Sequence, residues 1–141
     1  MLLAGDIGGT KTNLALYAPE GGLVAQAQAT FRSAHYASLE AVVKEFLATT
    51  EAEVDRAVFG VAGPVVDGES TTTNLPWVIR EADLQQALDL QEVKLLNDLE
   101  ATAYGVPRLS SSDLFQLNGA APESGTKVVV APGTGGPGCG L

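Results

Sequence analysis

The spacing of hydrophobic and polar positions changes twice along this chain. Short apolar runs at residues 2–5, 13–17 and 23–31 are separated by turn signals and predict an antiparallel meander of three strands. Over residues 38–50, apolar side chains recur at the i, i+3, i+4 and i+7 spacing of an amphipathic helix. Ser38 stands at the start of this run, where its hydroxyl can accept a hydrogen bond from the first turn as an N-cap.

Strands and helices alternate in the rest of the predicted fold. We expect a buried strand at 57–62, a short exposed strand at 70–74, a helix at 80–88, a strand at 93–96, a helix at 98–104 and a further strand at 127–131. The inward positions of the helix at 80–88 are predicted to be Ala82, Leu84, Ala87 and Leu88. Helices between the later strands require crossover connections, so we expect an α/β fold whose mixed sheet is covered on both faces.

Charge and cysteine content narrow the function classes. The chain has 141 residues and a formal net charge of −9, which disfavours nucleic acid and anionic membranes as partners. A site for a polyanion would then depend on backbone N–H groups, a helix N-terminus or Mg²⁺. Cys139 is the only cysteine, so neither an internal disulfide nor a structural zinc site is expected, and a reducing cytosol is the simplest setting.

The start of the chain does not have the pattern of a targeting segment. Met1-Leu-Leu-Ala is followed at once by Gly5-Asp6 rather than by a long apolar run, so we expect no signal peptide. No stretch approaches the roughly 20 apolar residues that a membrane-spanning helix needs. We therefore expect a cytoplasmic protein without a membrane partner.

The first candidate motif, GDIGGTKT, runs from Gly5 to Thr12 between two predicted strands. Glycine permits positive φ and lets the backbone approach a ligand closely. Thr10 adds a hydroxyl and an N–H, and Asp6 at the strand end is suited to orient water on a Mg²⁺ ion. The alternative is that Gly8-Gly9 only makes a two-residue hairpin turn. The spacing fits neither a Walker P-loop nor the Rossmann fingerprint.

The second motif is the pair Asn97-Asp98, which follows a predicted strand and opens a helix. Ligands of open α/β sheets bind at this edge, beyond the carboxyl ends of the strands. Asp98 can serve as the base for a hydroxyl nucleophile, because the largely dissociative transition state of phosphoryl transfer tolerates a weak base. Asn97 can donate to and accept from sugar hydroxyls. The alternative is that Asp98 is only a helix N-cap.

The third motif, PGTG at residues 132–135, follows the last predicted strand. A second phosphate-binding turn would occupy such a place. The motif alone is a weak signal, because glycine-rich ends are often disordered.

Together these motifs resemble the sugar kinase, actin and Hsp70 superfamily, whose two related domains clamp ATP between two phosphate-binding loops. Within it the chain resembles the bacterial glucokinases through nearly all its length, at GDIGGTKTNLAL at the start, GVAGPV at 60–65, TNLPW at 73–77, LLNDLEATAYG at 95–105 and APGTG at 131–135. The resemblance implies transfer of the ATP γ-phosphate to the 6-hydroxyl of glucose, with Mg²⁺ as cofactor.

The resemblance also implies roles for individual residues. Asp98 is implied as the catalytic base and Asn97 as a sugar ligand, with Gly63 and Asn74 near the sugar. Contacts to ATP are implied at Gly5, Asp6, Ile7, Gly8, Gly9, Thr10, Gly133, Thr134 and Gly135. Asp6 is further expected to bind Mg²⁺ through water.

The fold implied by the resemblance is the actin-like ATPase fold, which is similar to ribonuclease H. Residues 1–108 are expected to form its small N-terminal domain, with a mixed five-stranded sheet flanked by helices. Residues 109–141 are expected to be the truncated start of the large domain.

The final residues depart from the family pattern. The family's second loop usually reads like GTGLG, whereas this chain reads GTGGPGCGL from Gly133, and Pro137 lacks an N–H where a phosphate cradle needs donors. The printed sequence also lacks the family's second domain, with its further sugar-binding carboxylate and histidine groups and its C-terminal helix. We therefore expect a truncated chain that is inactive alone, and we hypothesise a reading-frame slip near codon 136 as its origin. A face left uncovered would favour self-association, including a homodimer.

Other functions stay open at this point. Related repressors use this domain as a non-catalytic sugar sensor, but they carry a helix-turn-helix before it, whereas Gly5-Asp6 follows Met1 almost at once. An Hsp70-like or actin-like ATPase would not need Asn97-Asp98 as a sugar site. A structural fragment without activity is the remaining alternative.

Three further residues are assigned lesser roles. His35, the only histidine, is interpreted as a surface residue rather than a metal ligand, because it lacks ligand partners in sequence. Trp77 is expected to pack in the interior at least as readily as against a sugar. Cys139 is interpreted as part of the atypical tail rather than as a nucleophile.

Overall fold

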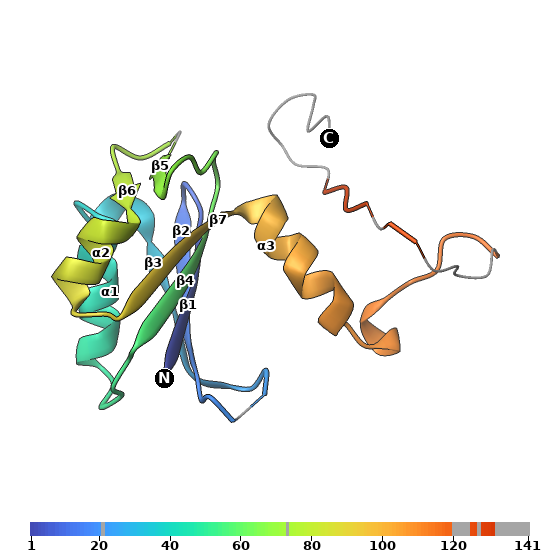
Figure 1. Cartoon of the computed structure of the whole chain (residues 1–141), viewed down its shortest axis with the longest axis horizontal. Helices are drawn as coiled ribbons and strands as arrows, with labels where there is room; N and C mark the ends of the chain where they lie inside the picture. Colours follow the sequence, from blue (N-terminus) through green and yellow to red (C-terminus); the bar gives the residue numbers. More distant parts are fainter. Residues whose placement is uncertain (21, 73, 120–124, 127, 132–141) are drawn as a thin grey trace. The chain divides into compact units, whose positions relative to one another are not determined.

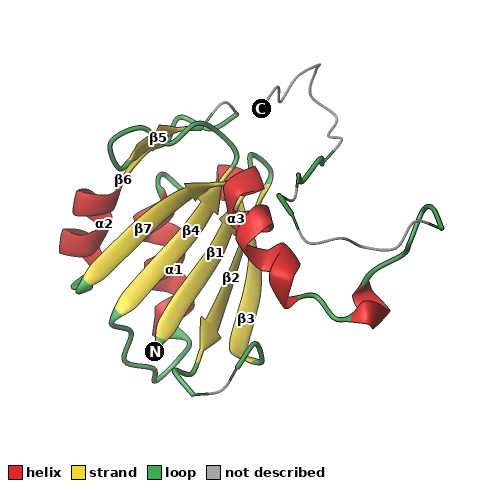
Figure 2. Ribbon diagram, turned by 45° about the vertical axis from the view of Figure 1, so that its right-hand side comes forward, coloured by secondary structure: helices red, strands yellow, loops and turns green. Residues whose placement is uncertain are grey.

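Five strands pair into one mixed sheet in the order β3-β2-β1-β4-β7 (Figure 2). The computed structural model describes residues 1–20, 22–72, 74–119, 125–126 and 128–131. The strands of the sheet are β1 (Leu2–Ile7), β2 (Lys11–Tyr17), β3 (Ala25–Arg32), β4 (Arg56–Val61) and β7 (Glu92–Asn97). The β1–β2 and β2–β3 pairs are antiparallel, whereas β1–β4 and β4–β7 are parallel. The predicted meander and the mixed five-stranded sheet are confirmed.

Two helices cover one face of this sheet (Figure 1). Helix α1 (Leu39–Ala48) precedes β4 and helix α2 (Glu81–Leu88) precedes β7. The Ser38 hydroxyl accepts a hydrogen bond from the Ala41 N–H at 3.4 Å, so the predicted N-cap of α1 is confirmed. Within residues 1–98, α1 and α2 lie on the same face, so the expectation of helices on both faces is met on one face only in this part of the chain.

The hydrophobic core lies between that sheet face and the two helices. Every second residue of a strand points to the same face, and in β2 these are Thr12, Leu14 and Leu16, all buried. The other core residues of the sheet and helices include Leu3, Ile7, Leu39, Val42, Val43, Phe46, Ala57, Phe59, Val61, Leu84, Val93 and Leu95. The apolar side chains of α1 form one stripe along the helix, and they pack against the inward-facing side chains of the strands in a single core.

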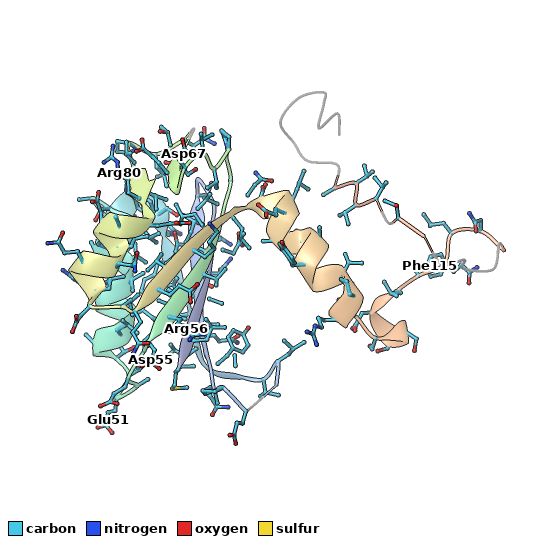
Figure 3. All side chains as sticks on the ribbon, in the orientation of Figure 1. Glu51, Asp55, Arg56, Asp67, Arg80 and Phe115 are labelled. Carbon is cyan, nitrogen blue, oxygen red and sulfur yellow. The ribbon has the colours of Figure 1, made fainter. Side chains whose placement is uncertain are left out.

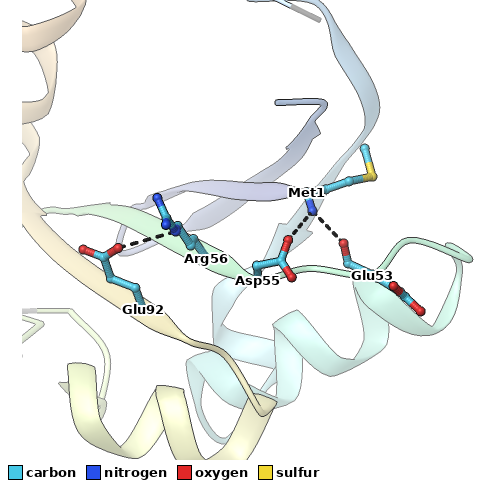
Figure 4. A network of polar contacts seen from close by, with 5 residues as sticks. All are labelled: Met1, Glu53, Asp55, Arg56 and Glu92. Carbon is cyan, nitrogen blue, oxygen red and sulfur yellow. Dashed lines mark hydrogen bonds and ion pairs between the residues drawn. The ribbon is translucent and has the colours of Figure 1, made fainter. Parts of the chain in front are cut away.

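The chain terminus at Met1 is fastened to the segment before β4 (Figure 4). The α-ammonium of Met1 donates to the Glu53 carbonyl at 2.7 Å and pairs with the Asp55 carboxylate at 3.0 Å. One residue further on, Arg56 and Glu92 form a 3.6 Å ion pair between β4 and β7. Both pairs are largely exposed, so each contributes at most about 1 kcal/mol to stability.

A two-stranded hairpin beyond the main sheet was not predicted from the sequence. Strands β5 (Glu69–Thr71) and β6 (Val78–Arg80) pair antiparallel, and Ser70 is only 2% exposed. The predicted exposed strand at 70–74 is therefore shorter than expected and its centre is buried. The following helix begins at Glu81 instead of Arg80, because Arg80 still belongs to β6.

Helix α2 buries a narrower stripe than its sequence predicted. Leu84 is fully buried and Leu88 packs against the core, as expected, but Ala82 and Ala87 are exposed. The helix has eight residues, little more than two turns, so only one side of it reaches the sheet. Leu90, just after the helix, is buried as well.

The chain divides after Asp98 into two units, Met1–Asp98 and Leu99–Leu141. The second unit contains most of helix α3 (Asp98–Gly105), which confirms the predicted helix, and 3-10 turns at Val106–Arg108 and Ser111–Asp113. Several of its apolar side chains are exposed, including Phe115 at 87% (Figure 3). The predicted domain boundary after residue 108 stays a prediction.

The predicted strand at 127–131 is wrong for the residues that the structure describes. Residues 128–131 adopt no strand, and Val128 and Val130 are 68% and 81% exposed. A strand needs a neighbour to pair its N–H and C=O groups, and no described segment pairs with this one. Lys127 lies outside the described residues. Among the described helices, none has the length and apolar character needed to cross a membrane.

We predict that Gly5→Ala destabilises the first unit by about 1–3 kcal/mol, because the core would be overpacked. A Cβ at Gly5 would lie 2.6 Å from Phe59 Cδ1 and 2.9 Å from Leu14 Cδ2, and both side chains are buried. Urea unfolding followed by the fluorescence of the only tryptophan, Trp77, measures the change. Gly119→Ala is the control, since a Cβ there has no neighbour within 4 Å. An unfolding midpoint for Gly5→Ala equal to that of the control would contradict the prediction.

Candidate functional site

The glycine motif forms the turn of the β1–β2 hairpin. The Gly8 N–H donates to the Lys11 carbonyl at 2.9 Å and closes the turn, so its predicted place between two strands is confirmed. Neither Gly8 nor Gly9 has positive φ; the described glycines with positive φ are Gly22 and Gly68. Conformational freedom is therefore not why glycine stands here.

Space is the reason for glycine at position 9. A Cβ at Gly9 would lie 2.8 Å from the Cβ of Asn74, closer than real side chains come. The turn and the loop that carries Asn74 are thus in direct contact, although 65 positions separate them in sequence (74 − 9). The N–H groups of Gly9 and Thr10 make no hydrogen bond with a described residue. Two backbone donors are therefore left in the turn, which is what an anionic ligand requires.

Two buried hydroxyls hold this turn from below. Thr12 and Ser33 are both fully buried, and their hydroxyl oxygens are 3.0 Å apart. Ser33 Oγ donates to the Gly8 carbonyl at 2.9 Å, and the Ser33 N–H donates to the Thr10 carbonyl at 3.1 Å. Sequence reasoning missed this pair. The available signal was a polar residue, Thr12, at an inward position of a strand whose other inward residues are leucines.

Asp6 lies on the sheet face opposite the helices. Asn13 Nδ2 donates to Asp6 Oδ2 at 3.1 Å, and Thr30 Oγ1 donates to Asn13 Oδ1 at 2.8 Å. These three residues are cross-strand partners on β1, β2 and β3. Within the described part of the chain, no group of three or more His, Cys, Asp or Glu side chains is arranged to hold a metal. Asp6 is therefore a single exposed carboxylate, a donor set that suits a hydrated Mg²⁺ ion bound through water.

Asn97 ends β7, and its side chain reaches across to the chain that follows β4. Asn97 Nδ2 donates to the Gly63 carbonyl at 2.9 Å. Helix α3 begins at Asp98 itself, so the residue at the N-cap position is Asn97 instead of Asp98. Asp98 is an exposed carboxylate in the first turn, where the helix dipole favours negative charge.

The loop between β5 and β6 carries Asn74 and is held by two buried residues. Thr72 Oγ1 donates to the carbonyls of Leu75 and Trp77, at 3.0 and 3.3 Å. Trp77 is 2% exposed, and its indole N–H donates to the Tyr36 carbonyl at 3.1 Å. This geometry favours the packing role considered for Trp77.

Gly63 joins this hairpin to the main sheet. A Cβ at Gly63 would lie 3.2 Å from the Thr71 carbonyl and 3.5 Å from Ser70 Oγ. The neighbouring Ala62 N–H donates to the Ile7 carbonyl at 3.1 Å, which keeps the end of β4 beside the end of β1. The structure therefore brings Gly9 to Asn74, and Asn97 to Gly63, at the carboxyl ends of the parallel strands.

The remaining residues singled out from the sequence lie elsewhere in the fold or outside its described part. Gly133, Thr134, Gly135 and Cys139 lie outside the described residues. His35 is exposed in a 3-10 turn, in agreement with a surface role. Gly5 and Ile7 lie within β1, and the Ile7 side chain is buried in the core.

The comparisons with known proteins agree with this fold and these motifs. The chain is 37% identical over 134 residues to a glucokinase of Yersinia enterocolitica, covering 94% of this chain and 41% of that protein. Among solved structures, it resembles a glucokinase from an Antarctic psychrotroph with a TM-score of 0.70 and 33% identity, over 79% of this chain and 36% of that one. A ROK family glucokinase from Streptomyces griseus, in complex with glucose and AMPPNP, has a TM-score of 0.60 and 22% identity, over 76% and 36% of the two chains.

The fold is that of the actin-like ATPases, in the form that sugar kinases use. The family model described as Glucokinase matches residues 3–141. The chain therefore belongs to the glucokinase family. It spans about 41% of the length of the curated relative from Yersinia, so it corresponds to the N-terminal portion of such an enzyme.

We predict that Asn97→Asp lowers the free energy of unfolding by about 1–3 kcal/mol, because a carboxylate cannot donate to the Gly63 carbonyl and would leave it unpaired. Thermal unfolding at neutral pH measures the loss. Gln86→Glu, the same amide-to-acid change at an exposed position of α2, is the matched control and should shift stability by no more than about 0.5 kcal/mol. Equal effects of the two substitutions would show that the Asn97–Gly63 bond contributes nothing specific.

Proposed function

We propose that this chain supplies the small domain of an enzyme that transfers the γ-phosphate of ATP to the 6-hydroxyl of glucose. Membership of the glucokinase family carries the proposal. The Asn97-Asp98 pair at the carboxyl end of β7 supports it, because this edge of an α/β sheet is where ligands bind. The chain spans about 41% of the length of the curated relative from Yersinia enterocolitica, so the activity is proposed for the whole enzyme.

Asp98 is the proposed base. An exposed carboxylate at the end of a strand can accept the proton of a sugar hydroxyl as the hydroxyl attacks phosphorus. A carboxylate is a weak base, but phosphoryl transfer needs little deprotonation before its loose transition state. The side chain of Asp98 follows directly after β7, so the end of that strand sets where the proton would be taken up.

Asn97 and Asn74 are the proposed sugar ligands on this side of the site. The bond from Asn97 Nδ2 to the Gly63 carbonyl fixes the plane of its amide, which leaves its orientation toward a hydroxyl set in advance. The loop with Asn74 is held by Thr72 and rests against Gly9. The loop proposed to bind the sugar and the turn proposed to bind phosphate therefore lie at the same edge of the sheet.

The turn at Gly8 to Thr10 is the proposed phosphate contact. The N–H groups of Gly9 and Thr10 are the donors that this turn would offer to ATP, without a cationic side chain. Mg²⁺, when bound, supplies positive charge to the phosphates of ATP. Asp6, at the end of β1, would hold it through water. Gly133 to Gly135 are proposed as the second phosphate turn on sequence alone.

The remaining expectations follow from this function. Glucose and ATP are the proposed ligands, and a cytoplasmic location is proposed because ATP is available there and the single cysteine needs no oxidising compartment. We propose no nucleic-acid or membrane partner, because the net charge is −9. A homodimer stays an open proposal. The sugar-sensor alternative is not favoured, because the matching family and relatives are glucokinases.

A chimera tests the proposal directly. Residues 1–118 of this chain replace the matching part of the Yersinia enterocolitica relative, and glucose-dependent ADP formation is followed with a coupled assay. We predict turnover in the chimera and a fall of about 10²- to 10⁴-fold in kcat with Asp98→Asn. Glu100→Gln, an exposed acid on the same helix, is the control and should leave kcat within about twofold.

Two results would count against this function. A folded chimera without glucose-dependent turnover would show that these residues do not form a competent small domain. Equal turnover in Asp98→Asn and Glu100→Gln would show that Asp98 is not the base.

A further inference from the structure

Strand β7 forms one edge of the five-stranded sheet, and its outer side is contacted by a glutamate from α2. In the described part of the chain, β7 pairs with β4 on one side and with no strand on the other. The Leu95 N–H donates to Glu81 Oε1 at 2.8 Å. Lys94 Nζ lies 3.2 Å from the same oxygen, and the Glu81 side chain is only 22% exposed. The Glu81 carboxylate therefore accepts one backbone N–H at an edge of β7 that pairs with no described strand.

Glu81 is fixed on its other side by the β5–β6 hairpin. Its N–H donates to the Gly68 carbonyl at 3.0 Å. Gly68 has φ of +73°, and a Cβ there would lie 2.8 Å from Glu81 Oε2. The preceding residue, Arg80, pairs with Glu69 at 2.6 Å, and this bond raises the pKa of Arg80 and keeps it charged. The glutamate is thus held in place before it contacts β7.

These contacts close a ring that includes the proposed site. Leu95 stands two residues before Asn97, whose side chain bonds the Gly63 carbonyl. Gly63 in turn packs against Thr71 of β5, the strand that follows Gly68. The path therefore runs from β7 through Glu81 to the hairpin, on to Gly63, and back to Asn97 at the end of β7. Each step is a direct contact that involves a backbone group of one of these residues.

We infer that Glu81 is a positioning residue for the Asn97-Asp98 pair. By binding the outer edge of β7, it holds the last residues of that strand in register with β4, so that Asn97 meets Gly63 and Asp98 follows directly after it. Glu81 touches no proposed substrate, so it acts through the strand. The functional meaning rests on the proposed role of Asn97 and Asp98, whereas the structural coupling does not.

A different explanation is that Glu81 only stabilises α2, as acids in the first turn of a helix do. Asp83 shares that property: it lies in the same first turn and pairs with Arg80 at 3.6 Å, on the side of α2 occupied by the hairpin. Asp83→Asn therefore removes a first-turn charge without removing the contact to Leu95. Glu81→Gln removes the charge but keeps an oxygen that can accept from the Leu95 N–H, whereas Glu81→Ala removes the acceptor.

Hydrogen exchange measured by NMR on the full chain, without ligand, separates the two explanations. We expect Glu81→Ala to speed exchange of the Leu95 N–H by about 10- to 100-fold, the size expected for losing a charge-assisted bond. Amides of β1 and β2 should change by less than about threefold. The side-chain NH₂ resonances of Asn97 should shift in Glu81→Ala, return toward their original positions in Glu81→Gln, and stay unchanged in Asp83→Asn.

The result that would overturn the inference is equally specific. If exchange in Glu81→Ala rises uniformly over the sheet, or the Asn97 resonances stay in place while Leu95 is freed, Glu81 contributes only stability. The same conclusion follows if Asp83→Asn reproduces the shift. Because no ligand or turnover enters these measurements, failure of the kinase assignment would appear only in the chimera with Asp98→Asn and would not be confused with failure here.

Discussion

The parallel pairing of β1, β4 and β7 is the constraint on which the candidate site depends. Their register sets Ile7 beside Val61 and Val61 beside Asn97, so three strands end in one row. Each strand then continues into a different part of the site: the glycine turn, the segment with Gly63, and the β7–α3 junction. A shift of one residue in either pairing would turn every inward side chain of that strand to the other face and would separate Asn97 from Gly63.

Glycine at this row works mainly by leaving room. Gly9 gives way to Asn74 and Gly63 to Thr71, and neither needs positive φ. Because Gly9 is in direct contact with Asn74, the proposed phosphate turn and the proposed sugar loop lie side by side at one edge of the sheet. The proposed anion donors of this acidic chain are backbone N–H groups, in a turn whose Gly8 and Thr10 carbonyls already accept hydrogen bonds from Ser33.

Most of the strands and helices, and the glycine and Asn-Asp motifs, could be predicted from the sequence, because hydrophobic periodicity and short motifs are local properties of the chain. The spacing of apolar residues predicts the helix that begins at Leu39 and the strand that ends at Asn97. The pairing of β5 with β6 could not be predicted, because the alternation of apolar and polar residues cannot be recognised in strands of three residues. The strand expected at 127–131 shows the opposite error: valine-rich sequence supplies propensity, but a strand forms only where a partner accepts its hydrogen bonds. The contact of Glu81 with Leu95 depends on how α2 is placed, which no local pattern encodes.

The two units of the chain differ in how many of their apolar side chains are buried. Residues 1–98 bury most of their large aliphatic residues in one core, whereas Leu114, Phe115 and Leu117 of the second unit are 57%, 87% and 92% exposed. The row of strand ends, the glycine contacts and the Glu81 bond all lie within residues 1–98. Exclusion of water from a reacting phosphate is a different task, because it requires a surface on the far side of the ligand. Within residues 1–98, the parallel register and the bond to the Gly63 carbonyl hold Asn97 at the end of β7, and shielding a reacting phosphate from water is a separate requirement of the proposed function.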